Sequence, residues 1–219
     1  MMTRNDFFEV SAMKWFFPLI LGFVLSVPSA PAQEQVVSPD ALIRQITEDV
    51  LSIVREDRDI QGGDTRKAIE LVEAKALPHF NFQRMTALAM GRDWKKADPG
   101  QRERLVDEFR TLLVRTYSNA LTGYKDQIVR YRPFNKPAGD GGDAVVRTEV
   151  LQSGGKPVQI DYSVEKGADG WKIYDVTVAG VSLVTNYRDT FNQEVRANGV
   201  DGLVKMLSDK NKQLEAGKK

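Results

Sequence analysis

The run VQIDYSVEKGADGWKIYDVTV, residues 158–178, predicts two β-strands joined by a tight turn. Apolar and polar side chains alternate along residues 158–166 and again along most of residues 171–178, which is the period of a strand with one buried face. The four residues between them, GADG, have the composition of a turn. We therefore expect a β-hairpin here, and the remaining predicted elements extend outward from it.

Two more alternating segments, residues 128–132 and 144–152, precede the hairpin, and glycine-rich joints separate the later segments. Short joints favour antiparallel neighbours, so we expect a four-stranded antiparallel meander. The alternation predicts one apolar and one polar face. The apolar face would carry Val146, Val150, Ile160, Tyr162, Val164, Tyr174, Val176 and Val178, and the polar face Arg147, Glu149, Asp161, Ser163, Asp175 and Thr177.

Segments of helical period lie on both sides of the predicted sheet. Ser38-Pro39 and Asp98-Pro99 each combine a capping side chain with a proline at the first helical position, which is the pattern of a helix start. The predicted helices cover residues 38–54, 64–77, 82–90, 98–121, 182–198 and 201–215. Helices before and after a sheet predict an α+β fold.

The amino-terminal 32 residues have the pattern of an export signal. Lys14 precedes a 13-residue apolar stretch, residues 15–27, and Ala30-Pro31-Ala32 has the small-residue pattern of a signal peptidase site, so we expect cleavage after Ala32. A stretch of this length spans roughly 20 Å as a helix, short of the roughly 30 Å hydrocarbon core, and is therefore not expected to span the membrane. Met13-Lys14 is a better start for such a signal than the acidic stretch before it, which leaves an over-extended gene start over residues 1–12 as an alternative. The remaining residues, 33–219, are expected to form a single domain in the periplasm or outside the cell.

Composition excludes several kinds of chemistry. The chain has no Cys and one His, so it can form neither a disulfide nor a cysteine nucleophile. The 31 Lys and Arg residues are balanced by 30 Asp and Glu residues, which argues against nucleic-acid binding. His79 follows Pro78 without a partner at metal-ligand spacing, so we expect no metal and no cofactor.

Two functions other than carriage of a ligand stay open on the residues alone. The first is a small α+β enzyme acting on an apolar substrate through His79 or an acid pair such as Asp161 and Asp175. The second is an interaction or chaperone protein that binds partner segments in an apolar groove.

A family resemblance rests on the segment WKIYDVTVAGVSLVTNYR, residues 171–188, with Phe191 after it. This segment strongly resembles the signature of the MlaC family, also called toluene-tolerance auxiliary proteins. The helical half resembles the same family at Phe80-Asn81-Phe82, Met85, Leu88, Gly91, Trp94, Gln101, Phe109, Leu112-Leu113 and Tyr117. The resemblance covers roughly residues 38–210.

The resemblance implies a periplasmic phospholipid carrier and no enzymatic activity. Such a carrier shuttles lipid between an outer-membrane lipoprotein–porin complex and the substrate-binding subunit of an inner-membrane ABC transporter, and maintains outer-membrane lipid asymmetry. It also implies a curved sheet packed against a helical layer, with the acyl chains of the cargo between them.

An apolar sheet face opposite apolar helix residues forms either a cavity or a packed core, because the two have the same composition. The resemblance favours the cavity. On this basis the predicted lipid-binding residues are Met85, Leu88, Phe109, Leu112, Leu113, Tyr117, Leu121, Val129, Val146, Val150, Ile160, Tyr162, Val164, Tyr174, Val176, Val178, Val184 and Tyr187.

Overall fold

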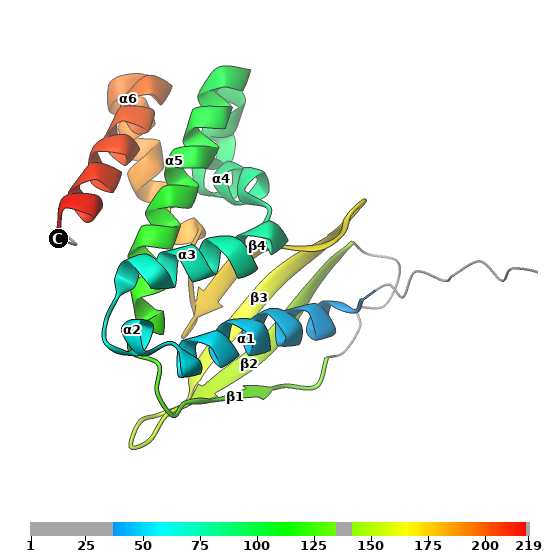
Figure 1. The fold of residues 1–219 in the computed structure, drawn as a ribbon. Coiled ribbons are helices and arrows are strands. Elements are labelled where there is room, and N and C mark those ends of the chain that lie inside the picture. The colour runs from blue at the N-terminus through cyan, green and yellow to red at the C-terminus, as the bar shows by residue number, and fades with distance from the viewer. Residues whose placement is uncertain (1–36, 135–141, 218–219) are drawn as a thin grey trace, which may run out of the picture. The chain divides into compact units, whose positions relative to one another are not determined.

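The computed structural model describes residues 37–134 and 142–217. In this part of the chain, helices cover one face of an antiparallel sheet (Figure 1). The expected export signal and its cleavage site lie outside these residues. The helices are α1 (Pro39–Glu56), α2 (Arg58–Gln61), α3 (Thr65–Lys75), α4 (Phe82–Met90), α5 (Pro99–Tyr117) and α6 (Arg188–Ala216). The strands are β1 (Ile128–Tyr131), β2 (Asp143–Leu151), β3 (Val158–Gly167), β4 (Gly170–Val178) and β5 (Val181–Ser182).

The sheet has the order β1-β2-β3-β4-β5, with every neighbouring pair antiparallel. This confirms the α+β class and the meander, but the expected number of four strands is wrong. The fifth strand, β5, has only two residues and pairs with the end of β4. Two residues are too few to show an alternating pattern, so the predicted helix over residues 182–198 included Ser182.

Local signals place the helix ends. The side chain of Asp98 accepts the backbone N–H of Gln101 at 2.8 Å, and the Gln101 side chain accepts the N–H of Asp98 at 3.0 Å, which forms a capping box ahead of Pro99. At the end of α4, Gly91 has a φ of 58°, which glycine adopts more readily than other residues. Gly199 has a non-helical φ of 72° within α6, so this helix consists of two parts that meet at a kink, between the helices predicted over residues 182–198 and 201–215.

A β-bulge changes which side chains of β4 face the helices. Asp175 pairs with Ser163 and Ile173 pairs with Val164, so Tyr174 is an extra residue with no partner across the ladder. Because a one-residue shift reverses the two faces, Ile173 takes the place on the apolar face that was predicted for Tyr174. Tyr174 instead packs beside the guanidinium of Arg84, which lies 3.6 Å from the ring centroid.

The helices and the sheet enclose three hydrophobic clusters. Phe109, Leu112, Phe191, Leu203 and their neighbours form a core among α4, α5 and α6. A second cluster joins α1, α2 and α3 around Val54 and Ile60. The third lies between Ile43 of α1 and the sheet residues Ala144, Val146, Val164 and Ile173. The amino-terminal part of α1 is thus packed directly on the sheet (Figure 1).

Arg84 links α4 to the sheet, at the start of β2 and near the end of β3. Its two terminal nitrogens donate to Asp143 at 2.9 Å each, and one of them also pairs with Glu165. Glu165 in turn accepts a hydrogen bond from the side chain of Asn81 at 2.6 Å. The hydrogen bonds from Arg84 hold the pKa of Asp143 below its usual range.

We expect this cluster to stabilise the fold less in acid. Because the pKa of Asp143 is lowered in the folded state, its contribution to the free energy of unfolding is complete above the ordinary aspartate pKa, about 4, and is lost as the pH falls through the lowered value. Arg84→Ala should therefore cost about 1 kcal/mol at neutral pH and less near pH 3. Urea unfolding at both pH values measures this difference. Arg104→Ala, which breaks an exposed pair with Asp201, is the control and should show no such pH dependence; a cost at Arg84 that does not change with pH would contradict the assignment.

Candidate functional site

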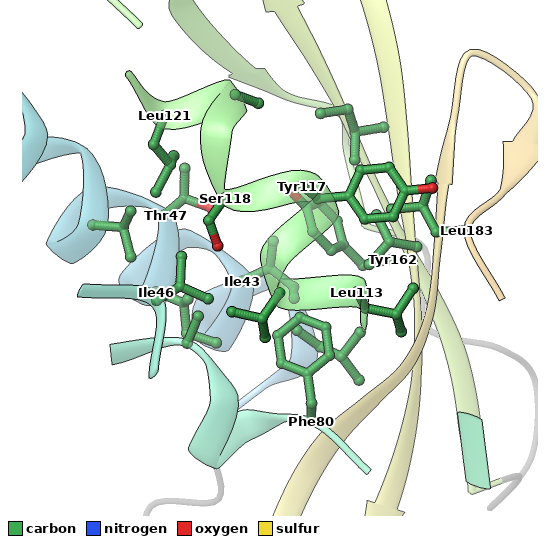
Figure 2. Close-up of a pocket in the computed structure, with 18 of the residues that line it drawn as sticks. Ile43, Ile46, Thr47, Phe80, Leu113, Tyr117, Ser118, Leu121, Tyr162 and Leu183 are labelled. Carbon is green, nitrogen blue, oxygen red and sulfur yellow. The ribbon is translucent and has the colours of Figure 1, made fainter. Parts of the chain in front are cut away.

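A cavity of about 470 Å³ lies between the sheet and the helices. Its wall is formed by α1, by α3 and the 3₁₀ turn after it, by the start of α4, by the end of α5 and the turn Ser118–Leu121, and by the inner face of the sheet (Figure 2). The volume is within the range of small-molecule sites, about 300–1,000 Å³. The apolar wall residues include Ile43, Ile46, Val50, Leu51, Val72, Leu77, Phe80, Phe82, Met85, Leu113, Val114, Tyr117, Leu121, Val129, Val150, Ile160, Tyr162, Ile173, Val176 and Leu183.

The period of each element explains which of its residues reach the cavity. On α1 the wall residues are 43, 46, 47, 50 and 51, spaced as i, i+3, i+4, i+7 and i+8, which is one face of a helix. On β3 they are Ile160 and Tyr162, two residues apart on one face of the strand. The α1 residues were not among the predicted site residues, although their helical spacing is visible in the sequence.

Half of the predicted lipid-binding residues lie in this wall. They are Met85, Leu113, Tyr117, Leu121, Val129, Val150, Ile160, Tyr162 and Val176. The other half lie elsewhere: Leu88, Phe109, Leu112, Tyr174, Val184 and Tyr187 in or against the core among α4, α5 and α6, Val146 and Val164 beneath α1, and Val178 near the end of β4.

Among the described residues, no charged side chain lines the cavity. One polar group of the wall is the hydroxyl of Tyr162, which interacts with the side chains of Thr148 and Thr47. Burial raises the pKa of Tyr162 to about 12, so the phenol stays neutral at ordinary pH. The cavity therefore suits an uncharged, apolar ligand portion.

The residues considered for acid–base chemistry lie outside the cavity wall. His79 is half-buried in the 3₁₀ turn Leu77–His79, and burial lowers the pKa of its imidazole. Asp161 and Asp175 pair with Thr177 and Ser163, on the face of the sheet opposite Tyr162 and Val176. No group of three or more His, Cys, Asp or Glu suited to a metal ion occurs in residues 37–134 and 142–217, and no helix there is long and apolar enough to cross a membrane.

The signature segment 171–188 shapes one side of the cavity. The hydroxyl of Ser182 donates to Asp175 at 2.6 Å and accepts the backbone N–H of Thr185 at 2.9 Å, which closes the turn between β5 and α6. Within that turn, the N–H of Leu183 donates to the carbonyl of Val176 at 2.8 Å, and both side chains line the cavity. Arg188 then ties α6 to the end of α4 through two bonds to the carbonyl of Leu88, at 2.9 and 3.1 Å.

Comparisons with known proteins agree with this geometry. Residues 44–209 match the family described as MlaC protein. The chain is 26% identical to the intermembrane phospholipid transport system binding protein MlaC of Haemophilus influenzae, over 89% of this chain and 92% of that one. It is 32% identical to the toluene tolerance protein ttg2D of Pseudomonas putida, over 49% of each chain.

A solved structure is also similar. It is a phospholipid-binding protein from Ralstonia solanacearum in complex with a phospholipid, 40% identical, with a TM-score of 0.74. The match covers 80% of this chain and 98% of that one.

Proposed function

Because the chain belongs to the MlaC family, we propose that it is a periplasmic phospholipid carrier that holds acyl chains in the cavity between sheet and helices. Its mature part, residues 33–219, would act as a single lipid-binding domain after cleavage of the signal at Ala32. It would take lipid between an outer-membrane lipoprotein–porin complex and the substrate-binding subunit of an inner-membrane ABC transporter, and so maintain outer-membrane lipid asymmetry. The carrier makes and breaks no covalent bond.

The observation that carries this proposal is an apolar cavity of about 470 Å³ whose described wall holds no charge. Exposing acyl chains to water costs about 0.8 kcal/mol per methylene, so about 30 methylenes face roughly 24 kcal/mol before compensation. An apolar enclosure offsets such a cost, and a charged wall would not. The phospholipid in the structure of the Ralstonia solanacearum relative supports the same cargo here.

The proposed contacts to the acyl chains come from both layers. The sheet contributes Val129, Val150, Ile160, Tyr162, Ile173 and Val176. The helices contribute Ile43, Ile46, Val50, Leu51, Met85, Leu113, Tyr117 and Leu121. A phosphate would stay outside, since burying an unpaired anion against these side chains is costly.

Native mass spectrometry of the mature protein, purified without detergent, tests this function. We expect a bound mass equal to that of a diacyl phospholipid, and the same lipid in an apolar extract of the sample. A folded protein that carries no lipid, even after incubation with phospholipid vesicles, would contradict the proposal. That result would favour a protein that binds partner segments in an apolar groove.

A further inference from the structure

The hydroxyl of Ser118 is a buried polar group in the wall of the apolar cavity. Ser118 follows the last residue of α5 and is 3% exposed. Its Oγ has no hydrogen-bond partner among the described residues, not even the carbonyl of Val114 four positions earlier, which a helical serine commonly reaches. Figure 2 shows the hydroxyl directed toward the space that Ile46 and Leu113 also border.

A buried hydroxyl without a hydrogen-bond partner is energetically unfavourable. The position of Ser118 in the cavity wall therefore indicates that a group of the ligand provides this partner. The other polar groups of the wall differ from it. Tyr124 donates to the carbonyl of Gln127 and accepts from Arg55, and the Tyr162 hydroxyl interacts with the side chains of Thr148 and Thr47. In the part of the chain that the structure describes, two other buried oxygens without partners, on Asp175 and Asn211, belong to residues outside the cavity wall. Within the described wall, Ser118 alone offers a buried oxygen with no partner of its own.

Ser118 also lies next to a residue of the cavity wall that solvent reaches. The preceding residue, Tyr117, lines the same cavity and is 36% exposed. In a diacyl phospholipid whose chains fill the cavity, the first polar groups beyond the chains are the two acyl esters. An ester carbonyl oxygen is a hydrogen-bond acceptor, and a serine hydroxyl is a donor.

We propose that the Ser118 hydroxyl donates a hydrogen bond to an acyl-ester carbonyl oxygen of the bound lipid. The inference rests on the proposed function, because it takes the cavity to hold acyl chains. It adds a selectivity: the site prefers ester-linked to ether-linked chains, since an ether lacks the carbonyl. The head group plays no part in this preference.

The test is a competition between two lipids that differ only in this linkage. Delipidated mature protein is mixed with equal amounts of diester and diether phosphatidylglycerol of the same chain length, and native mass spectrometry measures the ratio of the two complexes. We expect the wild type to favour the diester by about five- to tenfold, the effect of one buried hydrogen bond. Ser118→Ala should bring the ratio to about one, and Ser118→Thr, which restores a hydroxyl, should recover much of the preference. Ser52→Ala, on an exposed part of α1 outside the wall, is the control and should keep the wild-type ratio.

The outcomes separate this inference from the proposed function. Equal capture of both lipids by the wild type overturns the role of Ser118 and leaves the carrier intact, and so does a diester preference that persists in Ser118→Ala. Capture of neither lipid overturns the carrier itself. Ser118→Cys, which keeps the volume but is only a weak donor, replaces the alanine variant if that variant does not fold, and should likewise lose most of the preference.

Discussion

Replacing Val176 with tryptophan is expected to lower bound phospholipid at least tenfold while the protein stays folded. Val176 lies in β4 opposite Tyr162, and its side chain lines the cavity. The larger indole would occupy space that we assign to an acyl chain. Loss of two methylene contacts, at about 0.8 kcal/mol each, already exceeds the 1.4 kcal/mol of a tenfold change in affinity. Quantifying phospholipid per folded protein by mass spectrometry, with the melting temperature alongside, measures the effect.

The matched control is Val145→Trp. Val145 is 40% exposed on β2 and pairs with Ser163, on the face of the sheet away from the cavity, so the same substitution there should leave lipid loading unchanged. Val146 would be a poor choice, although it lies on the inner face, because it is 2% exposed beneath α1 and a larger side chain would disturb packing first. Normal loading in a folded Val176→Trp protein would show that the acyl chains lie elsewhere.

Residue periodicity predicts most of the fold but fails where a single residue changes the pattern. The hairpin, the capped start of α5 and the end of α4 at Gly91 follow from local signals that tertiary contacts do not override. At the bulge the alternation itself breaks, because the apolar residues Ile173 and Tyr174 are adjacent in the sequence, and the prediction extended the phase of Val176 back to Tyr174. Alternation therefore predicts the wrong face for Tyr174 and omits Ile173 from the cavity wall.

Periodicity also cannot separate cavity wall from packed core, as α5 illustrates. Phe109 and Leu113 are one turn apart on the same apolar stripe and were predicted to have the same role. Leu113 lines the cavity, whereas Phe109 is fully buried against α6 and the turn before it. The difference depends on which element lies opposite each residue, since α5 runs from the helical core to the sheet (Figure 1). On α1 the opposite error occurs. Its apolar residues at helical spacing are visible in the sequence, but none of them was predicted to line the cavity.

Phe109→Ala is expected to cost about 3–5 kcal/mol of unfolding free energy without changing lipid loading per folded molecule. The Phe109 ring is 0% exposed and makes edge contacts with Tyr187 and Phe191, with ring centroids 5.2 and 5.1 Å apart, so its removal leaves a cavity where α5 meets α6. Urea unfolding of delipidated protein measures the cost, because bound lipid would itself stabilise the folded state. Leu113→Ala is the counterpart: since Leu113 contacts the cavity as well as the core, its loss should lower both stability and loading. If Phe109→Ala instead lost lipid and kept its stability, the boundary between core and cavity along α5 would have to be moved toward the amino-terminal end of that helix.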